Sequence, residues 1–237
     1  MNRIRPQSRR RTGTGPGRRT CAPPHRFVPP ATILALALVI GSVLIFGALN
    51  DTQSPPEPSA EQAFAPPEAG GTASAAPPGV PPLPRAQPVR IRIPAIHVNA
   101  PFTKLHLDKA GVLRPPPATD AHLAGWYSEG TAPGSRGTAV TVGHVDTPAG
   151  DLGVFYELGT LTKGETIEVG RADHRTAVFT VDAVEAYDKD RFPRKKVYGR
   201  SERPELRLIT CAGYVRGAGY QRNIVVYATL TGSKKSD

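Results

Sequence analysis

Cys211 is the residue of this chain best suited to covalent chemistry. It directly follows the apolar stretch at residues 206–210 and precedes Ala212 and Gly213. The end of a strand that opens into a glycine-containing loop is where reactive side chains are commonly presented. We therefore interpret Cys211 as a nucleophile, the alternative being an inert thiol that packs as a small apolar residue.

A thiol nucleophile needs a partner that exchanges protons, and acyl chemistry also needs donors for an oxyanion. His144 is the favoured proton carrier because it follows the buried-type run at residues 138–143, at a second strand end. Four other histidines of this region are expected to be structural or solvated: His97, His106, His122 and His174. Arg222 begins the last apolar stretch, and its guanidinium could bind an oxyanion through two N–H groups. Arg216 is the alternative arginine.

Seven stretches with alternating or β-branched residues predict the strands that position these groups. They lie at residues 89–93, 102–107, 138–143, 166–169, 177–186, 206–210 and 224–230. Short helical turns are predicted at residues 121–128 and 151–158. Seven or eight short strands with little helix between them indicate a mainly β fold, a closed or nearly closed β-barrel. The domain is expected over residues 89–231, with a C-terminal tail at 232–237.

The basic charge of the chain is concentrated before this domain. The formal net charge is +10, yet residues 1–26 hold eight arginines and no acidic residue. This distribution favours a cytoplasmic tail over a nucleic-acid-binding surface. Residues 27–50 carry no charge, and nineteen apolar residues span about 28 Å in a helix. We expect an uncleaved transmembrane signal anchor with the domain outside the cell, the alternative being a cleaved signal peptide.

Residues 51–88 are expected to form a disordered spacer. Eleven of these 38 residues are proline, and most of the others are small or polar. Such a composition buries too little apolar surface to offset chain entropy, and proline favours extended structure. The other cysteine, Cys21, precedes the predicted span, so the two thiols would lie on opposite sides of a membrane. No acidic cluster indicates a metal site, and no cofactor is expected.

Three segments together resemble the sortase family. They are LITC at residues 208–211, TVGH at 141–144 and RNIVV at 222–226. Their order, and the sequence of basic tail, apolar span, spacer and β-rich domain, are also similar to sortases. The GHVDT run, Phe192-Pro193 and VYG at residues 197–199 look most like the class F sortases of high-GC Gram-positive bacteria, with class E as second choice.

The resemblance implies an eight-stranded sortase barrel and a membrane-anchored cysteine transpeptidase. Such enzymes cleave an LPxTG-like sorting signal through a thioacyl-enzyme and pass the protein to an amine, usually on a peptidoglycan precursor. It implies Cys211 as the nucleophile, His144 as the acid and base, and Arg222 as the group that orients the peptide and binds the oxyanion. It also implies a substrate-binding role for Thr210 and a supporting role for Asp146.

The basic segment at residues 187–203 would border the sorting-signal groove. It could also meet anionic wall polymer or lipid phosphate, or be a solvated loop. Two other functions stay open from the sequence. One is another cysteine acyl hydrolase, such as a cell-wall L,D-transpeptidase or amidase. The other is a membrane-tethered β-domain that binds cell wall or a partner protein without catalysis.

Overall fold

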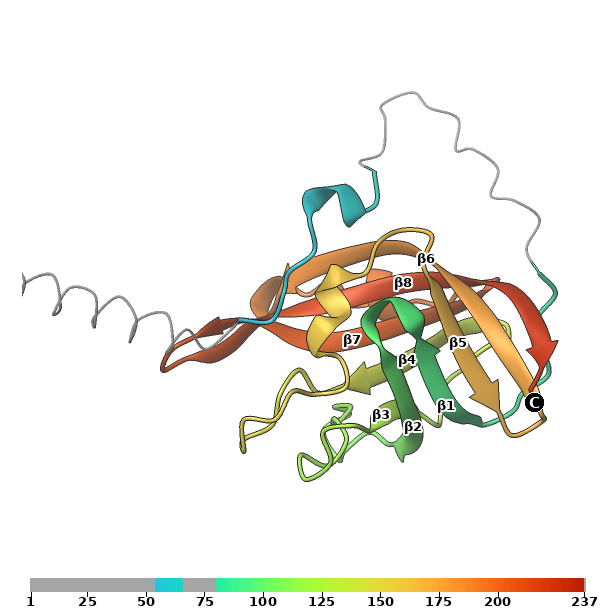
Figure 1. Ribbon diagram of the computed structural model, residues 1–237, viewed down its shortest axis with the longest axis horizontal. Coiled ribbons are helices and arrows are strands. Elements are labelled where there is room, and N and C mark those ends of the chain that lie inside the picture. The colour runs from blue at the N-terminus through green and yellow to red at the C-terminus, as the bar shows by residue number, and fades with distance from the viewer. Residues whose placement is uncertain (1–53, 66–79, 237) are drawn as a thin grey trace, which may run out of the picture. The chain divides into compact units, whose positions relative to one another are not determined.

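Eight strands form a closed barrel, as expected from the sequence. The computed structural model describes residues 54–65 and 80–236. The strand order is β1-β2-β3-β4-β7-β8-β6-β5, and β1 closes the barrel by pairing with both β2 and β5 (Figure 1). The strands are β1 Pro88–Ile93, β2 Val98–Leu105, β3 Ala124–Tyr127, β4 Gly137–Gly143, β5 Thr166–Arg171, β6 Arg175–Asp188, β7 Pro204–Val215 and β8 Gly219–Lys235. The short helices are η1 Ala60–Gln62, η2 Pro94–Ile96, η3 Tyr156–Thr160, η4 Lys189–Arg191 and α2 Arg194–Tyr198.

Alternation along β1 shows how the sequence builds this barrel. Ile91 and Ile93 are completely buried in the barrel core, whereas Arg92 between them is exposed. Side chains of a strand point alternately to its two faces, so the apolar residues fill the interior and the basic residues face water. The same alternation sets which residues of every other strand face inward.

β7 and β8 differ because both of their faces carry apolar residues. Leu206 and Leu208 lie in the barrel core. Ile209, Val225 and Tyr227 belong to a second cluster on the outside of the barrel. Val197 of α2 is completely buried in this outer cluster, which therefore seats the connection between β6 and β7 on the sheet.

One predicted helical turn is wrong. Residues 121–128 contain the strand β3, which pairs in parallel with β2 and antiparallel with β4. A Cβ atom on Gly125 would lie 2.4 Å from the side chain of Leu105 on the neighbouring strand. The absence of a side chain at this glycine lets the two strands approach, and tertiary pairing overrides the weak local preference. The other predicted turn, at residues 151–158, overlaps η3 in part.

Parts of the predicted spacer pack against the barrel, so the expected disorder is wrong for them. Residues 54–65, which we call the N-terminal arm, lie beside β6 and β8 (Figure 1). Leu83 is buried in the barrel core, and its backbone N–H donates to the Gly134 carbonyl at 2.8 Å. Arg85 donates to the carbonyls of Gly130 and Ser128 at 2.7 and 2.8 Å. The folded unit therefore begins before residue 89.

Truncating Leu83 should measure how much this preceding segment contributes to stability. We expect Leu83→Ala to lower the free energy of unfolding by about 2–5 kcal/mol, because the change leaves a cavity in the core. Denaturant unfolding of the full-length chain in detergent would measure it. Leu152→Ala is the matched control, since Leu152 is 59% exposed. Equal stability of the two variants would show that Leu83 does not anchor the segment.

The predicted basic tail and signal anchor, residues 1–26 and 27–50, lie outside the described residues. No helix within residues 54–65 and 80–236 has the length and apolarity needed to cross a membrane.

Candidate active site

Cys211 lies near the end of the barrel portion of β7 and points outward. Its neighbours Thr210 and Ala212 are buried, at 2% and 0% exposed, and Ala212 belongs to the barrel core. Successive side chains alternate between the faces of a strand, so Cys211 faces the outside. It is half-buried, and it is a free thiol. Thr210, predicted to bind substrate, instead faces the interior.

We use the name outward row for the outward-facing residues at the ends of the neighbouring strands β4, β7 and β8. Cys211 is its member on β7, and His144, directly after β4, is the next member. β4 and β7 are parallel neighbours, and their last paired residues are Val142 and Ile209. Both of these residues lie in or against the outer cluster. His144 and Cys211 each follow two residues later. Continuing this register one residue beyond the end of β4 puts both residues on the outer face, at the ends of neighbouring strands. The two residues predicted from strand ends therefore lie at the same end of the barrel.

The partner of Cys211 on its other side is Asn223 rather than Arg222. In the antiparallel pair of β7 and β8, Cys211 lies directly opposite Asn223, and Ala212 lies opposite Arg222. Directly opposed residues share a face of the sheet. Asn223 therefore joins the outward row, whereas Arg222 falls on the alternate face at the rim of the barrel. The sequence analysis passed over Asn223, and only the register distinguishes it from its neighbour.

Arg222 is engaged by two carboxylates in this structure. Its Nη1 atom donates to Glu57 of the N-terminal arm, and its Nε atom lies 3.5 Å from the Asp188 carboxylate on β6. Its side chain is 35% exposed. The rival Arg216 lies exposed in the turn between β7 and β8. The arginine predicted from the sequence is thus close to the row but bound to acidic side chains.

His144 is held by both its ring and its backbone. The Nε2 atom lies 2.7 Å from the carbonyl oxygen of Pro116. The His144 carbonyl accepts the Phe155 N–H at 3.0 Å. A Cβ atom on Gly153 would lie only 2.2 Å from the same carbonyl oxygen. Residues 153–155, directly before η3, therefore fix the position of His144 through backbone contacts, one of which requires glycine.

Replacing Gly153 should displace His144. We expect Gly153→Ala to destabilise the fold by about 1–3 kcal/mol, because the added methyl group overlaps backbone atoms that cannot move freely. Thermal unfolding and the reaction rate of the Cys211 thiol would both be measured. Gly170→Ala is the control, since its nearest contact would be an ordinary 3.7 Å. If both variants behaved as wild type, the close approach at Gly153 would not support the site.

Asp146 does not hold the histidine ring in the described structure. Its carboxylate instead accepts a hydrogen bond from the hydroxyl of Tyr220 on β8. Burial, followed by this carboxylate, raises the pKa of Tyr220, so the hydroxyl remains a donor. The contact ties the loop after β4 to the hairpin formed by β7 and β8. Asp146 thus ties down the loop that follows β4, and it makes no hydrogen bond to the His144 ring among the described residues.

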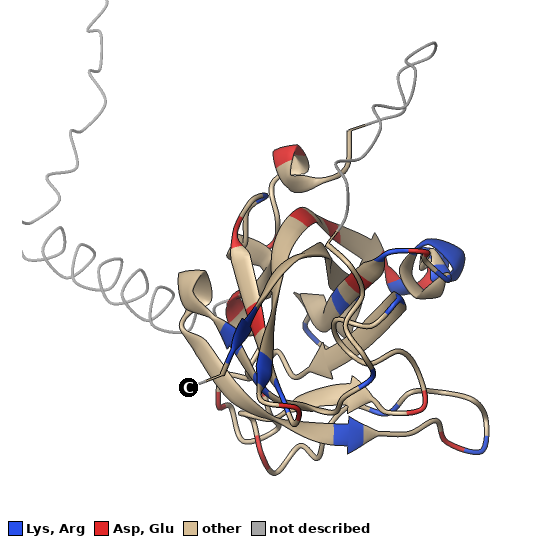
Figure 2. Ribbon diagram, turned by 90° about the vertical axis from the view of Figure 1, so that its right-hand side faces the viewer, with Lys and Arg blue, Asp and Glu red and all other residues tan. Residues whose placement is uncertain are grey.

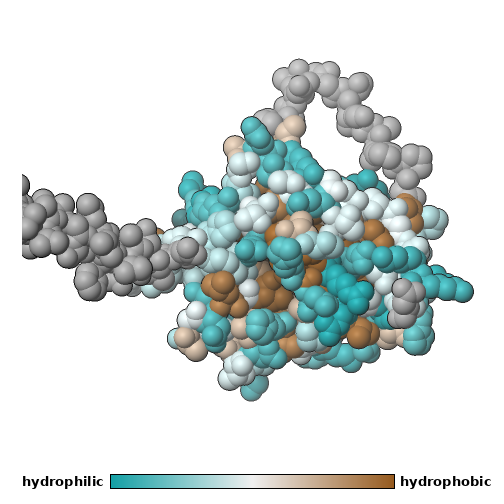
Figure 3. Space-filling view, in the orientation of Figure 1, coloured by the Kyte–Doolittle hydropathy of each residue, from teal (hydrophilic) through white to brown (hydrophobic). Residues whose placement is uncertain are grey.

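A groove of about 850 Å³ reaches this row at Asn223, while Cys211 and His144 are not among its lining residues. Its lining includes Asn223, three apolar or aromatic side chains (Tyr127, Val140 and Phe192) and three exposed cations (Lys189, Arg194 and Arg200). Figure 2 shows basic residues concentrated on the short helical segment at one side of the barrel. Figure 3 shows apolar residues reaching the surface among hydrophilic ones. Such a groove can hold an extended peptide with apolar side chains.

Comparison with known proteins identifies the family of this chain. A model of the sortase domain matches residues 91–231, which is more than half of the sequence. The chain belongs to the sortase family. Sortases are cysteine transpeptidases, so the family agrees with a thiol in the outward row. No curated protein matches the sequence.

The chain is also similar to solved structures of sortases. Sortase A from Listeria monocytogenes is 19% identical, with 65% of this chain and 92% of that chain covered and a TM-score of 0.46. Sortase C-1 from Actinomyces oris is 23% identical, with 62% and 75% covered and a TM-score of 0.46. Sortase A from Corynebacterium diphtheriae is 20% identical, with 65% of each chain covered and a TM-score of 0.47.

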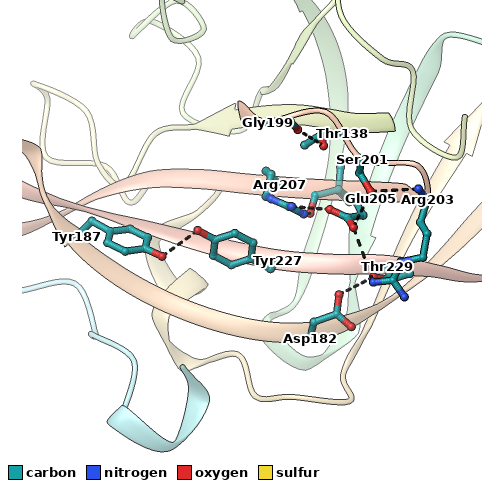
Figure 4. A network of polar contacts seen from close by, with 11 residues as sticks. Thr138, Asp182, Tyr187, Gly199, Ser201, Arg203, Glu205, Arg207, Tyr227 and Thr229 are labelled. Atoms are coloured by element: carbon teal, nitrogen blue, oxygen red, sulfur yellow. Dashed lines mark hydrogen bonds and ion pairs between the residues drawn. The ribbon is translucent and has the colours of Figure 1, made fainter. Parts of the chain in front are cut away.

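A polar network fixes the end of the β6–β7 connection in this sortase (Figure 4). Glu205 on β7 accepts hydrogen bonds from Arg207 at 2.5 Å and from Ser201 at 2.8 Å. The Thr138 hydroxyl on β4 donates to the Gly199 carbonyl at 2.7 Å. These bonds join the connection to two strands of the sheet. One wall of the sortase groove is therefore held in place at its base.

Lys196 fixes α2, the helix within the connection between β6 and β7. Its ammonium group donates to Glu185 at 2.5 Å. The rings of Phe64, Tyr227 and Tyr187 lie 5.0, 5.4 and 5.7 Å from it. A cation over aromatic faces is attracted by their quadrupoles. Because Phe64 comes from the N-terminal arm, the arm contacts both a groove wall and, through Glu57, Arg222.

Proposed function

We propose that this sortase is a membrane-anchored transpeptidase that cleaves an LPxTG-like sorting signal through a thioacyl-enzyme and transfers the protein to a cell-wall amine. The observation that carries the proposal is the outward row of His144 and Cys211 on the neighbouring strands β4 and β7, beside a peptide-sized groove. A thiol and an imidazole side by side at strand ends provide a nucleophile and a proton carrier. The groove supplies the place for the peptide.

In the first half-reaction, the Cys211 thiol passes its proton to His144 and its sulfur attacks the carbonyl carbon of the threonine–glycine bond. The sulfur–carbon bond forms, and the carbonyl electron pair moves to the oxygen. When this tetrahedral intermediate collapses, the carbon–nitrogen bond breaks and His144 gives a proton to the leaving amine. The product is a thioester between Cys211 and the threonine carbonyl.

In the second half-reaction, an acceptor amine attacks the thioester. His144 takes the proton from the attacking nitrogen, and the thiolate of Cys211 leaves. An amine is favoured over water because the unprotonated amine is the better nucleophile. Arg222 is proposed to orient the sorting peptide. This role requires the guanidinium to exchange a contact with Glu57 or Asp188 for one with the peptide.

The groove supports a peptide substrate with apolar anchor residues. Tyr127, Val140 and Phe192 provide apolar contacts suited to the leucine and proline of such a signal. The exposed cations at its rim are suited to anionic groups, whether on a wall polymer, a lipid phosphate or the substrate protein. We further propose the class F type, with class E as the alternative, and anchoring through residues 27–50.

The full-length chain in detergent, incubated with LPxTG-like peptides and amine acceptors, tests this function. Mass spectrometry should detect cleavage between threonine and glycine and an amide product that carries the acceptor. Cleavage to the free acid alone, at every acceptor concentration, would indicate a hydrolase. Absence of cleavage across the peptide panel would contradict the proposed substrate class.

A further inference from the structure

Asn223, the residue opposite Cys211, has a side-chain amide that no contact within the described residues explains. Asn223 lies directly across from Cys211 in the β7–β8 pair and across from Tyr187 in the β6–β8 pair. The hydroxyl of Tyr187 lies 2.9 Å from the hydroxyl of Tyr227 (Figure 4). No hydrogen bond joins the Asn223 amide to another residue in the described part of the chain. The amide lines the groove and is half-buried, so it faces the space a peptide would occupy.

Asn223 is close enough to Cys211 for its amide to contact a carbonyl group bonded to the Cys211 sulfur. Directly opposite Cβ atoms in an antiparallel pair lie about 4.5–5.5 Å apart. A carbonyl carbon bonded to the sulfur of Cys211 would place its oxygen within reach of the neighbouring side-chain amide. The amide NH2 group provides two donors and no charge, so its donors need no counter-ion.

Attack on a carbonyl requires donors aimed at the oxygen on which charge develops. Arg222 alternates to the other face of β8, opposite the buried Ala212, and its guanidinium binds Glu57 and Asp188. Asn223 is on the face of the nucleophile, and its amide donors bind no other group within residues 54–65 and 80–236. Geometry therefore favours the amide over the guanidinium as the donor present before substrate binds.

We propose that the Asn223 side-chain amide donates a hydrogen bond to the oxyanion of the tetrahedral intermediate formed on Cys211. The bond forms as the carbonyl electron pair moves to oxygen, and it weakens when the carbonyl is restored and the leaving group departs. Asn223 is thus a catalytic residue in addition to Cys211 and His144. The inference rests on the proposed acyl transfer at Cys211 but not on the identity of the sorting signal.

Acylation by p-nitrophenyl acetate tests the amide without a sorting peptide, because this ester also passes through an oxyanion on its way to a Cys211 thioester. We expect Asn223→Ala in the full-length chain to acylate about 10²–10³-fold more slowly than wild type. Asn223→Asp should be slower still, since a carboxylate repels the oxyanion. Gln221→Ala is the matched control: Gln221 is an exposed amide on the same strand whose donors bind the carbonyls of Ala218 and Gly219.

Alkylation by iodoacetamide separates this role from a structural one. Alkylation displaces iodide from a saturated carbon and forms no oxyanion, so its rate at Cys211 should stay at the wild-type value in Asn223→Ala. The proposal would be overturned if Asn223→Ala were acylated at the wild-type rate. It would also be overturned if alkylation of this variant slowed as much as its acylation. If the ester reaction responds as expected but no sorting peptide is cleaved, the proposed function fails while the role of Asn223 stands.

Discussion

Replacement of Cys211 by alanine is expected to abolish the covalent adduct between the chain and a sorting peptide. In wild type, the peptide's acyl group should add to the fragment that contains Cys211, and the adduct should persist when no amine is supplied. The reason is that Cys211 is the thiol in the outward row and lies opposite Asn223, which lines the groove. Mass spectrometry of the proteolysed adduct gives the measurement.

The second thiol provides the control for this experiment. Cys21 lies outside the described residues and well before the folded unit. Cys21→Ala should therefore form the adduct at the wild-type rate. An adduct that survives in Cys211→Ala, or peptide cleavage without any mass increase on the Cys211 fragment in wild type, would require a different nucleophile.

Removing the imidazole should have the next largest effect. We expect His144→Ala to slow both formation and release of the acyl-enzyme by about 10²–10⁴-fold, the usual contribution of a positioned proton carrier. Single-turnover kinetics with peptide, followed by addition of an amine, would resolve the two steps. The effect on release distinguishes this role from one in substrate binding, because the peptide is already attached.

Two further measurements make the histidine prediction specific. Free imidazole in the buffer should restore part of the rate in His144→Ala, since it can carry the proton without being attached. His106→Ala should react as wild type, because His106 is exposed and paired with Glu129 at 3.0 Å. Equal losses in both histidine variants, with no rescue, would show that His144 supports structure and does not transfer protons.

The barrel was predictable because its strands carry a local signal. Alternating isoleucine and arginine in β1 and β-branched runs in β4 and β8 indicate strands regardless of their partners. β3 was missed because residues 124–127 read AGWY, four residues that include a glycine and show no alternation. Its extended conformation comes from pairing with β2 and β4, which are tertiary contacts.

The site was only partly predictable for a related reason. Cys211 and His144 follow apolar strands, and a strand end is visible in the sequence. The face on which a side chain lies depends on the register, and a shift of one residue reverses it. For this reason, the sequence alone could not show which of Arg222 and Asn223 lies on the same face as Cys211. The packing of the N-terminal arm against the barrel could not be predicted either. A proline-rich segment has no periodic pattern from which contacts of Phe64 or Glu57 with the barrel could be inferred.

The place of β8 in the barrel has a consequence for how the molecule assembles. It is the last strand in the chain, yet it lies between β6 and β7 and pairs with both. Neither neighbour can complete its hydrogen bonds until residues 219–235 have been synthesised, so the barrel closes only after β8 is present. Folds dominated by such distant pairings assemble in about milliseconds to seconds. Cys211 meets Asn223 only when β8 docks, so the pairing of β8 with β7 completes the outward row.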